Sequence, residues 1–175
     1  YVSGSGGTSL VFAYEVQAGD TDGAGGIEAG TGALALAGGT LKDLAGNDLD
    51  LTTVAVASGT NRVVVDAVAP IVNIVQIRGT EDDGVTSKSG TLVAGNQIQV
   101  LAVTSEAITV TGTPEYTIDV GGVSHTATYV SGSGELLDPL IFAYTVQAGD
   151  ADGVGGIEAG TGALALAGGT LKDSD

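Results

Sequence analysis

The chain carries one segment of 34 residues twice. The first copy, Leu10–Asp43, reads LVFAYEVQAGDTDGAGGIEAGTGALALAGGTLKD, and the second, Leu140–Asp173, reads LIFAYTVQAGDADGVGGIEAGTGALALAGGTLKD. The copies differ only at Val11/Ile141, Glu15/Thr145, Thr21/Ala151 and Ala24/Val154. Upstream, the hexapeptide YVSGSG at Tyr1–Gly6 returns at Tyr129–Gly134. The period is therefore about 130 residues, which predicts tandem domains and not a short solenoid.

The phase of this repeat predicts the domain boundaries. The run Asp66–Pro70 (DAVAP) places a proline between two apolar, strand-like stretches, and we interpret residues 67–70 as a linker. Residues 1–66 then form the C-terminal half of one repeat. Residues 71–175 form the next repeat without its last strand or strands.

Apolar and polar residues alternate with a period of two in both halves of the chain. In Leu10–Gln17, for example, Leu10, Phe12, Tyr14 and Val16 would share one face. Turn residues interrupt the pattern about every ten positions, and no window carries a helical stripe. We expect an all-β fold of antiparallel immunoglobulin-like β-sandwich repeats, with about seven strands per unit. The expected strands are Leu10–Gln17, Ala33–Ala37, Val54–Ala57, Arg62–Val65, Ile71–Arg78, Ile98–Val103, Ile108–Thr111, Tyr116–Val120, His125–Val130 and Leu140–Gln147.

Composition excludes several classes of function. The chain has 21 acidic and five basic residues, a net charge of −16, so it lacks the clustered cations that bind nucleic acid or an anionic membrane surface. It has no cysteine for disulfides or thiolate chemistry, and its apolar runs are too short for membrane insertion. The acidity has two interpretations: solubility through charge repulsion, or carboxylates that converge on bound cations.

Several stretches in a fixed order carry a resemblance to a known family. They include Gly95–Gly122 with the turn Thr104–Glu106 (TSE), the segment Phe142–Gly153 (FAYTVQAGDADG) and the run Asp43–Asn47 (DLAGN). In this order the chain resembles the bacterial immunoglobulin-like tandem repeats of giant secreted adhesins and related calcium-rich surface proteins. The resemblance covers nearly the whole chain. It implies an extracellular location at the bacterial cell surface, a structural or adhesive role, and stiffening by calcium.

The pattern Asp-x-Asp-Gly is the strongest candidate for a metal site. It occurs as Asp20 and Asp22 in the first copy and as Asp150 and Asp152 in the second. Two carboxylates on one side of a glycine-rich loop suit a hard cation, which takes six to eight oxygen ligands. The alternative is an acidic β-turn that needs no ion. A second acidic group contains Asp43, Asn47, Asp48 and Asp50, for which ordinary Asx-turns are as good an interpretation as cation binding.

Loop positions in a sandwich suggest how some of these residues could meet. With Ile71–Arg78 as the first strand of its unit, Glu106 would lie at the end nearest the linker, and Asp20 and Asp22 would lie at the facing end of the preceding unit. We therefore predict that Asp20, Asp22, Asp66 and Glu106 bind a calcium ion between repeats.

We do not expect an enzyme. The single histidine, His125, falls in a strand-like run, and without cysteine a nucleophile–base pair is nearly excluded.

We expect a calcium-stiffened spacer in an extracellular adhesin or surface fibre, whose partners are neighbouring repeats. Any host or surface ligand would bind domains outside this chain. The alternative is a self-assembling filament or sheath subunit, in which identical chains complete one another by strand addition. A carbohydrate- or ice-binding module would need more than the short ladder of Thr109, Thr111 and Thr113.

Overall fold

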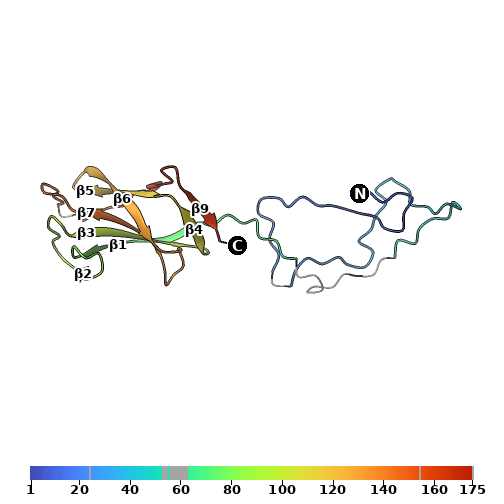
Figure 1. The fold of residues 1–175 in the computed structure, drawn as a ribbon, viewed down its shortest axis with the longest axis horizontal. Coiled ribbons are helices and arrows are strands. Elements are labelled where there is room, and N and C mark those ends of the chain that lie inside the picture. Colours follow the sequence, from blue (N-terminus) through green and yellow to red (C-terminus); the bar gives the residue numbers. More distant parts are fainter. Residues whose placement is uncertain (24, 53–54, 56–62, 154, 175) are drawn as a thin grey trace. The chain divides into compact units, whose positions relative to one another are not determined.

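The computed structural model describes residues 1–23, 25–52, 55, 63–153 and 155–174. The chain divides into two compact units, Tyr1–Ala69 (unit 1) and Pro70–Asp175 (unit 2). Unit 2 contains every named strand, and all strand pairs are antiparallel (Figure 1). The expectation of an all-β antiparallel fold is confirmed.

Unit 2 is built on a sheet of seven strands in the order β2-β1-β3-β7-β6-β5-β8. A separate pair, β4 and β9, forms a second sheet, so the described part of unit 2 has nine strands instead of about seven. The strands are β1 (Val72–Thr80), β2 (Ser87–Lys88), β3 (Gln97–Thr104), β4 (Ile108–Thr111), β5 (Glu115–Val120), β6 (Val123–Ser131), β7 (Leu140–Thr145), β8 (Leu164–Ala165) and β9 (Thr170–Asp173).

The core of unit 2 follows from the alternation in its central strands. In β3, Ile98, Val100 and Ala102 point to the same face and are almost fully buried. Their partners in β7 include Phe142 opposite Val100 and Leu140 opposite Ala102, both also buried. Partly buried side chains from the small sheet, Val110 and Leu171, pack against this cluster, so the two sheets share one core.

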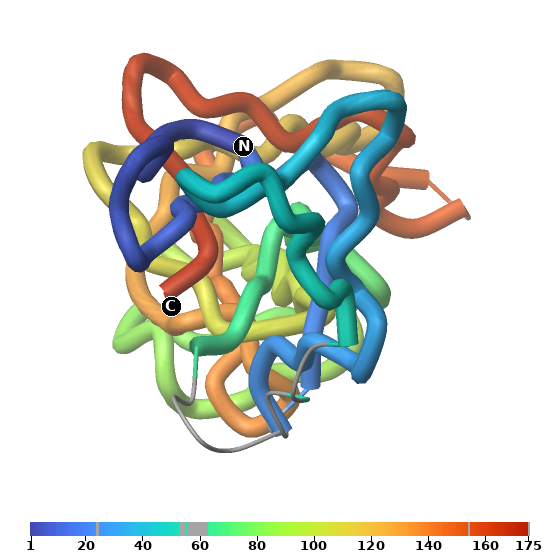
Figure 2. The backbone as a smooth tube through the Cα atoms, turned by 90° about the vertical axis from the view of Figure 1, so that its right-hand side faces the viewer, coloured from blue at the N-terminus to red at the C-terminus, as the bar shows by residue number. Residues whose placement is uncertain are grey.

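Unit 1 has a different organisation, although half of it repeats the sequence of unit 2. Its described residues form turns, extended segments and three isolated bridges, Ser3 with Val11, Thr21 with Asp66 and Lys42 with Asp48. Figure 2 traces the backbone of this unit as the part of the tube coloured from blue to green. The predicted strands Leu10–Gln17 and Ala33–Ala37 are therefore wrong for this structure: Val11 alone makes a bridge in the first, and the second has none. The predicted strand Val54–Ala57, apart from Ala55, and Arg62 of the predicted strand Arg62–Val65 lie outside the described residues.

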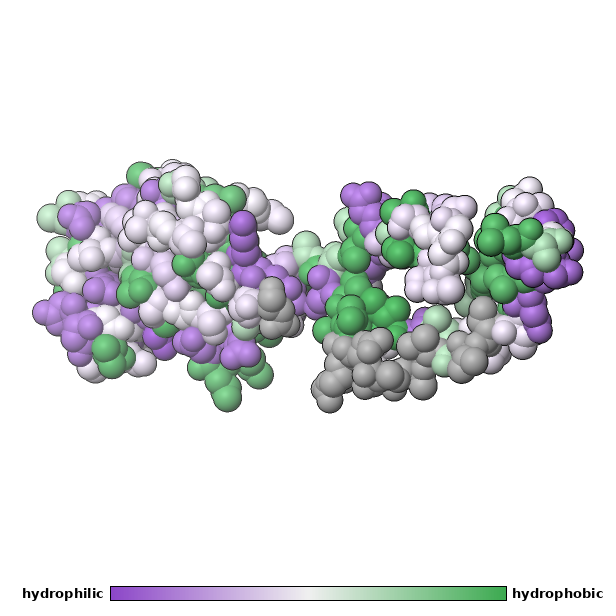
Figure 3. Space-filling model, turned by 45° about the vertical axis from the view of Figure 1, so that its right-hand side comes forward, coloured by the Kyte–Doolittle hydropathy of each residue, from purple (hydrophilic) through white to green (hydrophobic). Residues whose placement is uncertain are grey.

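The missing strands of unit 1 have a physical cause. A strand needs a neighbour to satisfy its backbone N–H and C=O groups and a facing layer to bury its apolar side. In unit 2 the segments β3, β5 and β6 supply both to β7, and no described residue of unit 1 is equivalent to β3 or β5. The apolar side chains of the first copy stay exposed as a result, and Figure 3 shows hydrophobic groups on the surface of unit 1.

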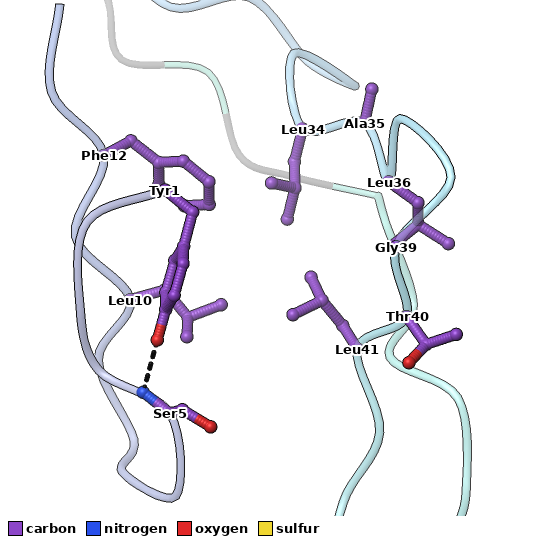
Figure 4. Close-up of a pocket in the computed structure, with 10 residues that line it drawn as sticks. All are labelled: Tyr1, Ser5, Leu10, Phe12, Leu34, Ala35, Leu36, Gly39, Thr40 and Leu41. Carbon is purple, nitrogen blue, oxygen red and sulfur yellow. Dashed lines mark hydrogen bonds between the residues drawn. The ribbon is translucent and has the colours of Figure 1, made fainter.

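A hollow of about 270 Å³ in unit 1 marks the place of the absent core layer (Figure 4). Its lining residues include Tyr1, Phe12, Leu34 and Leu41, whose counterparts in unit 2 are Tyr129, Phe142, Leu164 and Leu171. The edge-on aromatic pair is retained: ring centroids are 5.9 Å apart for Tyr1 and Phe12, and 6.0 Å for Tyr129 and Phe142. In unit 2, however, the ring of Tyr116 from β5 packs against Phe142 at 5.5 Å. We interpret the hollow as a gap in a core and not as a ligand pocket.

Candidate functional site

The first Asp of each Asp-x-Asp pattern anchors a tight turn. In unit 2, Asp150 Oδ2 accepts hydrogen bonds from the Tyr144 hydroxyl and the Gln147 backbone N–H, both at 2.8 Å. In unit 1, Asp20 Oδ2 accepts the equivalent bonds from Tyr14 and Gln17 at the same distances. The turn therefore forms from local sequence alone, with or without a surrounding sheet. One carboxylate oxygen of Asp20 and one of Asp150 are therefore already engaged in holding the turn.

The surroundings of this turn differ between the units. His125, which lies opposite Ile118 in the β5–β6 pair, is in ring contact with Tyr144 at 4.7 Å. Its Nε2 is 3.7 Å from Asp150 Oδ1. His125 is thus a cross-strand residue, as expected from its strand-like context. Unit 1 has no histidine.

These contacts change the acidity of both partners in the turn of unit 2. Hydrogen bonds from the Gln147 backbone and the Tyr144 hydroxyl, with the nearby His125, lower the pKa of Asp150. Desolvation, with the hydrogen bond to the Asp150 carboxylate and the charge of that group, raises the pKa of Tyr144 to about 12. The anionic carboxylate and the neutral phenol are therefore the stable pair.

The structure places Asp20, Asp22 and Asp66 on one pair of extended segments in unit 1. Thr21, between the two aspartates, forms the bridge with Asp66, and the Asp22 backbone N–H donates to Val65 O at 2.7 Å. Asp22 Oδ2 is shielded from solvent without a hydrogen-bond partner among the described residues. Its counterpart in unit 2, Asp152, lies instead in a groove described below.

The second acidic group folds as a turn. Both carboxylate oxygens of Asp43 accept hydrogen bonds, from the backbones of Ala45 and Asn47 and from the Asn47 side chain. These bonds, led by that of the Asn47 side chain, lower the pKa of Asp43. Asp48 forms an ion pair with Lys42. This is the Asx-turn geometry that was the alternative to cation binding.

Glu106 has an acidic neighbour that sequence reasoning missed. Carboxylate oxygens of Glu106 and Asp173 lie within 4.8 Å of each other, and both residues are half-buried. Asp173 reaches this position because β9 pairs with β4, which sets it opposite Ile108. Asp173 is the copy of Asp43, a residue that the sequence had already marked as a candidate ligand. The pairing of β9 with β4, which brings Asp173 close to Glu106, was not predictable from the repeat.

This acidic pair lies where the chain enters unit 2. Ser105, next to Glu106, donates its backbone N–H to Ile71 O at 2.8 Å, and its hydroxyl oxygen accepts the Ile71 N–H at 3.1 Å. Two converging carboxylates can hold part of the shell of a metal ion. A calcium ion takes six to eight oxygens, so the pair fits such an ion only with further ligands, and nothing in its geometry is specific to calcium.

Comparison with known proteins adds no information on the role of these residues. No family model matches the chain, and no match was found among curated proteins or among solved structures. Among the described residues there is no helix long and apolar enough to cross a membrane.

Proposed function

We propose that the chain is a non-enzymatic structural spacer of an extracellular adhesin or surface fibre, made of immunoglobulin-like repeats that calcium stiffens at their junctions. The observation that carries this proposal is the Glu106–Asp173 pair beside Ser105, the residue that fixes the first residue after the linker. A cation bound there would act on the hinge between repeats. The near-identical copies support a repetitive, mechanical role.

Asp66 is the proposed third ligand. It lies five residues before Ile71, and five extended residues span roughly 17 Å, so the linker is long enough to let its carboxylate reach the pair. Asp66 is exposed in unit 1, where its backbone is fixed opposite Thr21. Asp20 and Asp22 lie on the adjoining segment and would supply negative charge next to the ion.

Calcium titration of the chain tests this proposal. The expected result is a rise in melting temperature and a longer, narrower particle in small-angle X-ray scattering, both reversed by a chelator. Changing Glu106 and Asp173 to Gln and Asn should abolish both responses, because two ligands lose their charge. Asp82→Asn, at an exposed acidic residue of the same unit, is the matched control and should respond like the original protein. Unchanged melting and scattering on calcium addition would refute the proposal.

A second candidate function, a self-assembling filament or sheath subunit, is favoured by the exposed apolar segments of unit 1. Phe12 is 53% exposed while its copy Phe142 is fully buried. Unpaired, apolar extended segments are where chains add strands to one another. A concentration-dependent increase in particle mass, absent when Phe12 and Tyr14 are changed to Ser, would support this role. A monomer at all concentrations would exclude it.

A further inference from the structure

Unit 1 shows which strand pairs with the turn segment of the repeat. Residues 19–22 and Ile27 lie beside residues 63–67, joined by four backbone hydrogen bonds. Gly19 N–H donates to Ala67 O at 2.8 Å, and Ala67 N–H donates to Asp20 O at 2.9 Å. Asp22 N–H donates to Val65 O at 2.7 Å, and Ile27 N–H donates to Val63 O at 2.8 Å.

Unit 2 contains the same turn segment without that neighbour. Residues 149–157 differ from 19–27 only at Ala151 and Val154. Within the described part of the chain, the N–H groups of Gly149, Asp152 and Ile157 have no backbone hydrogen-bond partner. A free segment of this kind is an edge onto which a strand can be added.

This edge borders a groove of about 720 Å³ in unit 2. One wall is formed by residues 150–153 with Gly156 and Ile157, and the other by Ile77–Gly79 of β1 with residues 90–92. The buried side chains of Ile98, Val120 and Val146 belong to its lining. The groove therefore combines backbone groups on one wall with apolar side chains in a mixed polar and apolar lining, and a valine-rich strand can use both.

Part of β1, which contributes Ile77–Gly79 to the groove, also has an open edge. Val75 shares its face with Ala102, its partner in β3, and Ala102 is fully buried whereas Val75 is 39% exposed. Among the described residues β1 pairs with β2 only at Gly79 and Thr80, so its stretch from Val72 to Arg78 has a neighbour on one side only.

We propose that this groove is the docking slot for a second copy of the segment 63–67 (VVVDA), which leaves the turn segment of its own unit 1 and is presented in extended form by another copy of the chain. The near-identical turn segment of unit 1 already pairs with this strand, which fixes both its identity and its register. By that register Gly149 and Asp150 pair with the incoming Ala67, Asp152 pairs with Val65, and Ile157 pairs with Val63. The partner named here rests on the second proposed function, the self-assembling subunit, and it does not depend on calcium.

The decisive experiment adds a synthetic peptide of residues 60–69 (TNRVVVDAVA) to the full chain in the presence of a chelator. Amide hydrogen exchange is followed by NMR. We expect saturating peptide to slow exchange at least about tenfold at Gly149, Asp152 and Ile157, because their N–H groups gain partners. Gly19, Asp22 and Ile27, which are already paired, should not change.

Two control peptides test the register. A peptide with Ala67→Pro lacks the N–H that would donate to Asp150 O and should give little protection. A peptide of the same composition in scrambled order should give none. Equal protection by all three peptides, which would mean an unspecific apolar contact, would overturn the proposal, and so would no protection by the natural peptide.

The outcomes separate this inference from the two proposed functions. Protection by the peptide together with a monomeric chain would show that the groove binds this strand, but it would overturn the proposal that another copy of the chain supplies it, and it would exclude the self-assembling subunit. No protection together with concentration-dependent assembly would overturn the slot and leave assembly to another surface. The calcium response is read in a different experiment and is unaffected by either result.

Discussion

The two copies of the repeated segment share 30 of 34 residues and take different structures. Leu140–Asp173 supplies β7, β8 and β9 of a packed unit, whereas Leu10–Asp43 has turns and isolated bridges within its described residues. Contacts between residues close together in the sequence occur in both copies. Examples are the Tyr–Asp hydrogen bond of the turn and the edge-on aromatic pair. Among the described residues, named strands and a buried core occur only in the second copy, whereas the first copy makes isolated backbone pairs, such as that of Thr21 with Asp66.

The difference between the two copies shows which parts of the β-structure depend on nearby residues and which depend on partners elsewhere in the fold. The turn around Asp20 forms in unit 1 because its donors lie three and six residues away. The strand at Leu10–Gln17 does not form, because its hydrogen bonds and its burial would come from segments equivalent to β3 and β6. In this chain an alternating sequence is therefore not enough to form a strand. The strand forms only where other segments of the fold supply backbone hydrogen bonds and a face to pack against.

The largest expected effect is on the core. Phe142→Ala should lower the free energy of unfolding of unit 2 by about 3–5 kcal/mol, because it removes a fully buried aromatic ring. Phe12→Ala, the same change in the first copy, should cost only about 0.5 kcal/mol, as at an exposed site. Urea denaturation followed by circular dichroism measures both. Similar losses from the two substitutions would mean that the copies are equally packed.

A smaller effect is expected from the turn. Tyr144→Phe removes the hydroxyl that donates to Asp150 and should destabilise unit 2 by about 1 kcal/mol. Tyr14→Phe removes the equivalent bond from the exposed turn of unit 1 and should leave the main unfolding transition unchanged. Thermal denaturation of the two variants beside the original chain gives the comparison. A larger shift for Tyr14→Phe would contradict the assignment of the main transition to unit 2.

The smallest expected effect is on the pH dependence of stability in acid. The pKa of Asp150 is lowered in the folded state by the bonds from Gln147 and Tyr144, so the unfolded chain binds a proton there first as the pH falls. The stabilisation is complete above the unfolded value of about 4 and is lost as the pH falls through the lower, folded value. Asp150→Asn should therefore give a melting temperature that depends less on pH between 5 and 2. An unchanged pH dependence would show that other carboxylates control acid unfolding.

Much of unit 2 was predictable from alternation. The runs Ile98–Val103, Tyr116–Val120 and Leu140–Gln147 overlap β3, β5 and β7, because each buries one face of the sheet and so repeats every two residues. The short strands β2 and β8 were missed, since two residues carry no period. β9 was missed as well, in the run that follows Gly168 and Gly169.

The candidate sites were predictable only in part. Glu106 was recognised from its turn, but its neighbour Asp173 depends on the β4–β9 pairing, which no local pattern encodes. The groove of unit 2 was likewise not foreseen. Its lining comes from β1, β2, β3, β5, the loop before β3 and the turn after β7, and sequence spacing does not bring these together.

Hydrogen exchange of the two copies in one sample tests the central claim most directly. Peptides covering residues 10–17 and 140–147 differ in mass at Val11/Ile141 and Glu15/Thr145, so mass spectrometry distinguishes them. In dilute solution we expect slow exchange in 140–147, whose amides pair with β3 and β6, and exchange near the rate of an unfolded chain in 10–17. Equal protection of the two peptides would contradict the account, because the strand would then form without its partners.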